Sequence, residues 1–115
     1  MLVARYYAPG DVRMEDMPEP TPGPKEVKLR VHANSICGTD AKIFQHGHHR
    51  LDPPRVLGHE LAGEVVEVGA EAIGGWSVGD RVQVIAAVPC GDCEYCERGW
   101  QTVCPTQKAV GYHWD

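Results

Sequence analysis

Residues 90–104 read CGDCEYCERGWQTVC, a stretch with four cysteines in fifteen residues. Thiolates two residues apart can converge on one ion from a tight turn, and four of them complete a closed tetrahedral shell around zinc. A closed shell leaves no position for water or substrate, so such an ion has a structural role and stabilises a lobe with little core of its own. We therefore predict a structural zinc lobe over residues 88–105, with the ligands Cys90, Cys93, Cys96 and Cys104.

Two other interpretations of this stretch remain open at the level of sequence. Cysteines at 90, 93 and 96, with a fourth before Pro105, resemble the ligands of an iron–sulfur cluster. In that pattern, however, the last gap has three residues, whereas here it has seven. Free or disulfide-bonded thiols are the other alternative, and the lack of a secretory signal disfavours disulfides.

The sequence on either side of residue 90 favours short strands separated by turns. Apolar alternation and β-branched residues predict strands over 2–7, 12–15, 26–33, 61–68 and 81–87. A short helix is expected from a cap at Thr39 or Asp40 to Gly47, and a helical turn over 94–98. Several short strands with turn signals indicate a small barrel or a sandwich, and the pattern does not choose between the two.

Composition limits the possible functions. A chain of 115 residues suffices for one small domain, and its net charge of −5 without a basic run argues against a nucleic-acid partner. No apolar run reaches the ~20 residues that span a bilayer, and the N-terminus lacks the pattern of a signal peptide. We therefore expect a cytoplasmic protein with no membrane partner, where clustered cysteines are more often metal ligands than disulfides.

A second set of residues offers ligands for an open metal site. Cys37 lies in the sequence CGTD at 37–40, and His59 and Glu60 lie in GHE at 58–60. A thiolate, an imidazole and a carboxylate are ligand types of a catalytic zinc site, which has three protein ligands plus water. Asp40 can accept a hydrogen bond from the free imidazole N–H. Neighbouring strand residues point to opposite faces, so both His59 and Glu60 reach one metal only if the backbone bends at Gly58.

Four motifs together resemble the medium-chain dehydrogenase/reductase family, and are most similar to its zinc-dependent alcohol and polyol (sorbitol- and threonine-dehydrogenase-like) members. They are CGTD at 37–40, GHE at 58–60, GDRV at 79–82 and the cysteine lobe, in the family's order and approximate spacing. The resemblance implies a mainly β, GroES-like, partly open β-barrel with short helices and a zinc-binding cysteine lobe. It also implies hydride transfer between an alcohol or polyol and NAD or NADP, in an enzyme that forms homo-oligomers.

The same resemblance assigns roles to individual residues. Cys37 and His59 would bind the catalytic zinc, with Glu60 a ligand in at least some states. The lobe cysteines would bind the second, structural zinc. Thr39 would supply the hydroxyl that first accepts the alcohol proton. Independently of the resemblance, the residue types place Asp40 outside the ligand set, as a support for the imidazole.

The sequence departs from this family in two respects. Lys42 stands where many relatives carry a histidine that passes the proton to solvent. No glycines are spaced as Gly-x-Gly, so a Rossmann cofactor domain is not expected within residues 1–115. We therefore expect these residues to form the N-terminal part of a catalytic domain, incomplete at its C-terminus and inactive alone. The alternatives are a non-catalytic, metal-stabilised binding module and, less favoured, a ferredoxin-like electron carrier.

The histidines at 46, 48 and 49 form a further cluster. Because they lack regular ligand spacing, a solvated loop is the favoured interpretation. The alternative is that His48 and His49 line the mouth of the substrate site.

Overall fold

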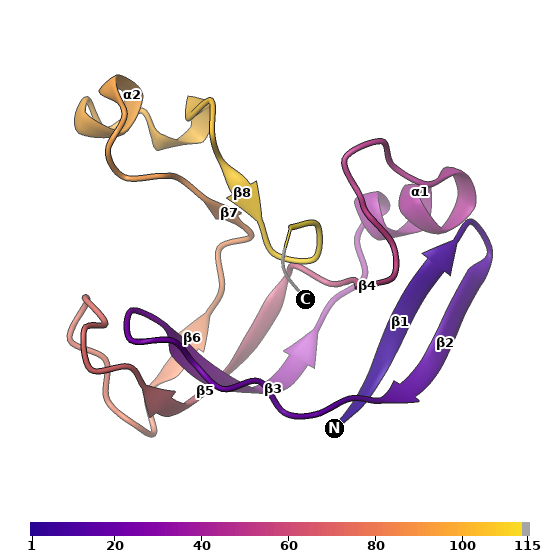
Figure 1. Ribbon diagram of the computed structural model, residues 1–115, viewed down its shortest axis with the longest axis horizontal. Helices are drawn as coiled ribbons and strands as arrows, with labels where there is room; N and C mark the ends of the chain where they lie inside the picture. Colours follow the sequence, from indigo (N-terminus) through magenta and orange to yellow (C-terminus); the bar gives the residue numbers. More distant parts are fainter. Residues whose placement is uncertain (114–115) are drawn as a thin grey trace.

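The computed structural model describes residues 1–113, so Trp114 and Asp115, the last residues of the predicted 1–115 unit, lie outside the described residues. Strands predominate, in three separate sheets that do not close into a barrel (Figure 1). This arrangement confirms the predicted mainly β, open architecture. The strands are β1 (Leu2–Ala8), β2 (Asp11–Asp16), β3 (Val27–Asn34), β4 (Arg55–Val56), β5 (Leu61–Val68), β6 (Arg81–Gln83), β7 (Ala87–Val88) and β8 (Lys108–Ala109).

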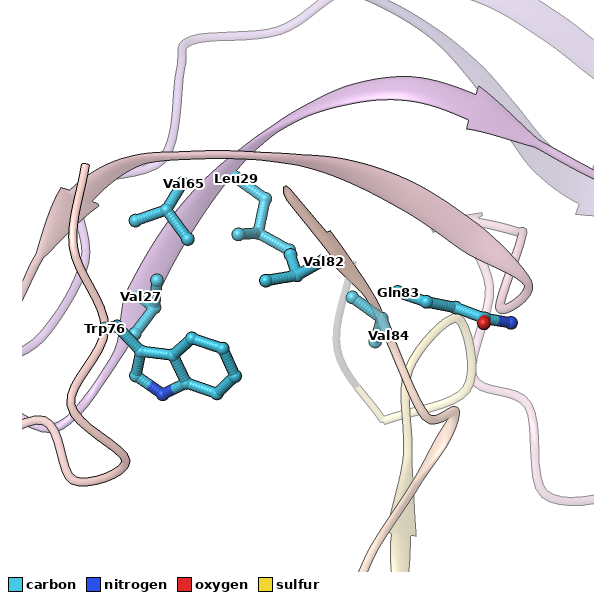
Figure 2. Close-up of a pocket in the computed structure, with 7 residues that line it drawn as sticks. All are labelled: Val27, Leu29, Val65, Trp76, Val82, Gln83 and Val84. Carbon is cyan, nitrogen blue, oxygen red and sulfur yellow. The ribbon is translucent and has the colours of Figure 1, made fainter. Parts of the chain in front are cut away.

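All the strand pairs are antiparallel. One sheet has the order β2-β1-β4, the second β3-β5-β6, and the third is the β7-β8 hairpin that carries the cysteine lobe. The second sheet presents a concave apolar face with a hollow of about 230 Å³ (Figure 2). Its lining residues are Val27, Leu29, Val65, Trp76, Val82, Gln83 and Val84. The lining is apolar apart from Gln83 and contains no titratable group.

The helical elements of the described chain are short. Helix α1 (Gly38–His46) ends at Gly47, whose φ of 73° is accessible to glycine at little cost, as the sequence predicted. Helix α2 (Glu94–Glu97) forms the predicted helical turn, and a 3₁₀ turn, η1 (Gln101–Val103), follows it. Within residues 1–113 no helix has the length and apolar character needed to cross a membrane.

The principal core is small and lies under α1. Tyr6 of β1, Ile43 of α1 and Leu51 form a buried cluster, against which Leu57 and Tyr112 pack. Tyr6 and Ile43 are each 1% exposed. This contact fixes α1 on β1 and thereby places the start of the helix beside the loop that precedes β5.

Two strand predictions need correction. The predicted strand over 81–87 is divided, because β6 ends at Gln83 and β7 begins at Ala87. The apolar alternation over 26–33 predicts that Val27, Leu29 and Val31 share one buried face, but Val31 is 53% exposed. The register is unbroken from Leu29, opposite Val65, to Val31, opposite Gly63, so Val31 stays on the face of Leu29; its cross-strand partner is a glycine, which has no side chain to cover it.

Two candidate metal centres

The first centre is built on the start of α1. The helix is capped by Cys37, so the predicted cap at Thr39 or Asp40 was wrong. The Cys37 Sγ accepts a hydrogen bond from the Thr39 N–H at 3.2 Å, and the Asp40 Oδ2 accepts one from the Cys37 N–H at 2.9 Å. This reciprocal pair is a capping box in which a thiol takes the place of the usual hydroxyl. It holds the Cys37 and Asp40 side chains on the same side of the helix start.

His59 joins these two side chains from the loop before β5. Its Nε2 lies 3.2 Å from the Cys37 Sγ, and its Nδ1 lies 3.6 Å from the Asp40 Oδ1. The backbone turns at Gly58, whose φ is 115°. One ligand atom from each of Cys37, Asp40 and His59 lies within 4.8 Å of the other two. The Nε2 of His59 therefore faces the Cys37 thiol, and its Nδ1 faces the Asp40 carboxylate.

The Asp40 carboxylate carries an uncompensated oxygen. Its side chain is 12% exposed, and the buried Oδ1 has no hydrogen-bond partner among residues 1–113. A buried carboxylate oxygen without a partner is costly, and a positive charge nearby removes that cost. The oxygen faces the His59 Nδ1, so a cation bound at the other ring nitrogen would polarise that N–H toward it.

The donor set fits zinc. For tetrahedral zinc with Zn–S of about 2.3 Å and Zn–N of about 2.1 Å, the sulfur and nitrogen lie about 3.6 Å apart. The Cys37 Sγ and His59 Nε2, at 3.2 Å, need to separate by only a few tenths of an ångström. A thiolate and an imidazole at this separation are thus nearly pre-arranged for the ion.

Glu60 is directed elsewhere. Its exposed carboxylate accepts a hydrogen bond from the Ser35 hydroxyl, and its backbone oxygen accepts one from the Ser35 N–H at 3.0 Å. The structure therefore brings three of the predicted residues together and holds Glu60 apart from them. The contact with Ser35 was not foreseen, because a single serine near a cysteine carries no sequence signal.

The other residues singled out near this centre differ in exposure. Thr39 is half-buried in the first turn of α1, directly beside the Cys37 sulfur, whereas Lys42 is exposed on the same helix. Tyr112, which sequence patterns did not indicate, approaches His59 edge-on with 6.4 Å between the ring centroids. Burial, and then the charges of Asp40 and Cys37, raise the pKa of Tyr112 above its usual value. Tyr112 is thus part of the surroundings of this centre.

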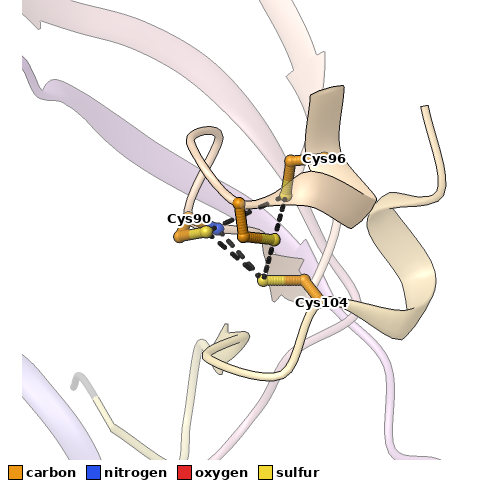
Figure 3. Close-up of side chains that lie close together, drawn as sticks. Cys90, Cys96 and Cys104 are labelled. Atoms are coloured by element: carbon orange, nitrogen blue, oxygen red, sulfur yellow. Dashed lines mark hydrogen bonds between the residues drawn. The ribbon is translucent and has the colours of Figure 1, made fainter. Parts of the chain in front are cut away.

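The second centre is the cysteine lobe, which stands away from the other two sheets (Figure 1). Its four sulfurs converge, and each lies within 4.8 Å of the others (Figure 3). Neighbouring sulfurs are 3.5 Å apart for Cys93 and Cys96 and 3.6 Å for Cys104 and Cys90. The Cys90–Cys96 and Cys93–Cys104 separations are both 3.9 Å.

These separations match a single tetrahedral ion. Four sulfurs about 2.3 Å from zinc lie about 3.8 Å from one another. A disulfide needs about 2.05 Å, and all five cysteines of the chain are free. A multi-iron cluster places several metals between the thiolates and so spreads them further apart. The geometry therefore favours one ion over both alternatives.

The thiols of the lobe differ in acidity. The Cys90 N–H donates a hydrogen bond to the Cys104 sulfur and lowers the pKa of that thiol to about 6, whereas burial raises the pKa of Cys96 to about 12. A negative charge on one sulfur disfavours the deprotonation of the neighbouring thiol. A bound dication would remove this opposition, because metal binding displaces the thiol protons.

Comparison with known proteins identifies the domain family and several relatives. The alcohol dehydrogenase GroES-like domain matches residues 23–113. A sorbitol dehydrogenase of Halalkalibacterium halodurans is 38% identical over 115 residues, which cover 99% of this chain and 33% of the relative. An L-threonine 3-dehydrogenase of Pyrococcus abyssi is 46% identical over 99 residues, which cover 84% of this chain and 28% of the relative.

Solved structures agree with these relatives. The crystal structure of a protein described as a zinc-binding dehydrogenase from Sinorhizobium meliloti 1021, bound to NADP, has a TM-score of 0.87 and 33% identity to this chain. The match covers 99% of this chain and 33% of the solved one. The chain thus spans about a third of the length of the proteins it matches.

Proposed function

The chain belongs to the alcohol dehydrogenase GroES-like domain family, and we propose that it forms the metal-binding part of the catalytic domain of a zinc-dependent dehydrogenase. The proposed reaction is the oxidation of a small alcohol or polyol, with transfer of a hydride to NAD or NADP. The relatives named sorbitol and threonine dehydrogenase support this reaction class. We assign nicotinamide binding to a Rossmann domain outside residues 1–115, since no Gly-x-Gly pattern occurs within them.

The observation that carries this proposal is the Cys37–His59 pair. A cysteine at a helix start and a histidine 22 positions later place their sulfur and nitrogen 3.2 Å apart. The two side chains leave coordination positions free for a further ligand and for substrate, as an open catalytic site requires. A binding module stabilised only by the cysteine lobe would not need this second group of metal ligands with open coordination positions.

Each residue then has a defined task. Cys37 and His59 would hold the catalytic zinc, and Asp40, whose Oδ1 lies 3.6 Å from the His59 Nδ1, would orient the His59 ring. Zinc, when bound, supplies Lewis acidity that lowers the pKa of the alcohol hydroxyl. Thr39, beside the Cys37 sulfur, is the proposed first acceptor of the alcohol proton. Glu60 would become a ligand only after leaving Ser35.

The cysteine lobe has a structural role in this proposal. Its sulfurs would bind a second zinc in a closed shell, which supplies the stability that a four-residue helix and a three-residue 3₁₀ turn cannot supply through packing. The lobe connects to β8, and the chain then returns to the first centre through Tyr112. The lobe thereby helps to position one wall of the catalytic site.

We also propose a cytoplasmic homo-oligomer. Five free cysteines are typical of a reducing compartment. Large apolar side chains are exposed on the described surface, among them Ile73 at 90% and Ile85 at 81%, and such residues are suited to contacts with further protein. The net charge of −5 gives no support for a nucleic-acid partner.

Metal analysis combined with kinetics tests the proposed function. In the natural enzyme we expect about two zinc ions per chain and nicotinamide-linked oxidation of alcohols. Cys37→Ser is expected to remove one zinc and to lower kcat/KM by roughly a thousandfold or more, while the lobe keeps its metal. Cys93→Ser is the matched variant for metal content, since it removes a lobe ligand and should remove the other zinc while Cys37 and His59 keep theirs. Full alcohol oxidation by Cys37→Ser would show that this site does not catalyse the reaction.

A further inference from the structure

Ser35, directly after β3, is joined to Glu60 by two hydrogen bonds. The register of β3 against β5 pairs Asn34 with Leu61, and one residue further the Ser35 N–H donates to the Glu60 carbonyl oxygen at 3.0 Å. The Ser35 hydroxyl donates a second hydrogen bond, to the Oε2 of the Glu60 carboxylate. The backbone contact extends the antiparallel pairing, and the side-chain contact directs the carboxylate toward the serine.

This serine–glutamate contact lies beside both proposed zinc ligands. Ser35 precedes Cys37 by two residues, and Glu60 follows His59 immediately. Among residues 1–113, the ligand atoms that converge at this centre come from Cys37, Asp40 and His59, and Glu60 is outside that group. A carboxylate is an ordinary zinc ligand. Glu60 is therefore a potential ligand next to the site, and its partner in the structure is a serine.

The backbone that carries Ser35 is held in place by close contact between the two segments. An added Cβ on Gly58 would lie 2.3 Å from the side-chain Nδ2 of Asn34, so the residues before Ser35 and before His59 touch. Serine loses little side-chain entropy when it is ordered, whereas glutamate loses much. Glu60 is exposed, so it keeps one position only where a partner holds it. Ser35 is suited to be that partner.

We propose that Ser35 is a positioning residue, which holds the Glu60 carboxylate away from the open coordination position of the Cys37–His59 site. The inference rests on the proposed function and concerns the regulation of that same site. Without the hydroxyl, the carboxylate is free to compete with any other ligand for the metal. The apparent affinity of that other ligand then falls in proportion to the fraction of sites that remain open. Because one hydrogen bond contributes modestly, Ser35 biases the position of Glu60 without locking it.

Imidazole binding to the cobalt-substituted natural enzyme tests this role. Cobalt occupies the Cys37 site while zinc stays in the lobe, and the visible spectrum reports imidazole, a neutral ligand, at the open position. In Ser35→Ala we expect the dissociation constant of imidazole to rise about threefold or more. Ser35→Thr keeps the hydroxyl and should stay within about twofold of wild type. Ser77→Ala changes the only other serine of the chain, which is also exposed, and as the matched control it should leave the constant unchanged.

A double substitution separates positioning of Glu60 from a general structural effect of Ser35. If Ser35 acts through the carboxylate, Ser35→Ala should have no effect on imidazole binding when Glu60 is already alanine, whereas a structural effect would persist. The inference is overturned if Ser35→Ala binds imidazole as tightly as wild type, if Ser35→Thr is as weak as Ser35→Ala, or if Ser35→Ala weakens binding equally with and without Glu60. Failure of the proposed function is detected separately, because the zinc-loaded wild type would then oxidise no alcohol whatever the imidazole affinities.

Discussion

Replacing Asp40 by asparagine tests whether this carboxylate orients the zinc-binding imidazole. Oδ1 of Asp40 is buried, unpaired and 3.6 Å from the His59 Nδ1, while Oδ2 caps α1 through the Cys37 N–H at 2.9 Å. Asparagine has nearly the same shape, and its carbonyl can keep the cap. Its uncharged amide cannot stabilise the positive charge that a metal induces on the ring. The substitution therefore isolates the electrostatic part of the interaction.

The expected loss of metal affinity can be taken from comparable metal sites. Substituting the hydrogen-bond partner of a metal-bound histidine typically weakens metal affinity 10- to 100-fold, which is about 1.4–2.8 kcal/mol. Asp40→Ala should lose this amount and also the cap, which contributes about 1 kcal/mol to the stability of the protein. Both variants should therefore bind the metal more weakly, and only Asp40→Ala should also have a lower melting temperature.

Chelator competition measures the affinity of the Cys37 site. Cobalt bound there reports occupancy while zinc remains in the cysteine lobe, and thermal unfolding reports the cap. Glu94→Gln is the control, since Glu94 is an exposed carboxylate whose ion pair with Arg98 at 2.6 Å is far from the Cys37 site along the chain. Exposed pairs of this kind contribute ~0–1 kcal/mol. If Asp40→Asn binds cobalt within about threefold of wild type, Asp40 has no role in metal binding.

Three further substitutions probe other parts of the structure. Cys104→Ser opens the four-sulfur shell and should remove one zinc per chain by elemental analysis, so an unchanged zinc content would contradict the structural site. Ile43→Ala leaves a cavity at a position that is 1% exposed. It should lower the free energy of unfolding by about 2–5 kcal/mol and Tm by roughly 10 °C or more. A Tm decrease below about 3 °C would show that this core contributes little to stability. Gly58→Ala places an alanine at a φ of 115° and its Cβ against the Asn34 side-chain amide, and this strain should lower the free energy of unfolding by about 1–3 kcal/mol. It should weaken cobalt binding at His59 and leave the lobe metal in place, and equal loss from both centres would indicate general unfolding instead.

Local patterns were sufficient for much of the fold. The strand over 61–68 and the end of α1 at Gly47 depend on neighbouring residues, and the sequence predicted both. The convergence of the lobe cysteines is also local, because all four fall within fifteen residues and short loops close at little entropic cost. The cap of α1 was misplaced, because a thiol is not among the usual capping groups and its role depends on the pairing with Asp40.

Sequence alone thus determined the residue types and the spacing from which the two metal centres were predicted, and the family to which they point. Only the tertiary structure decided how distant residues meet. The turn at Gly58 brings His59 to Cys37, whereas the contact with Ser35 draws Glu60 away from them. The approach of Tyr112 to the same histidine spans more than fifty residues and depends on the packing of its turn against Gly58. Contacts of this kind arise from the relative placement of separate elements, and periodicity within one element carries no information about that placement.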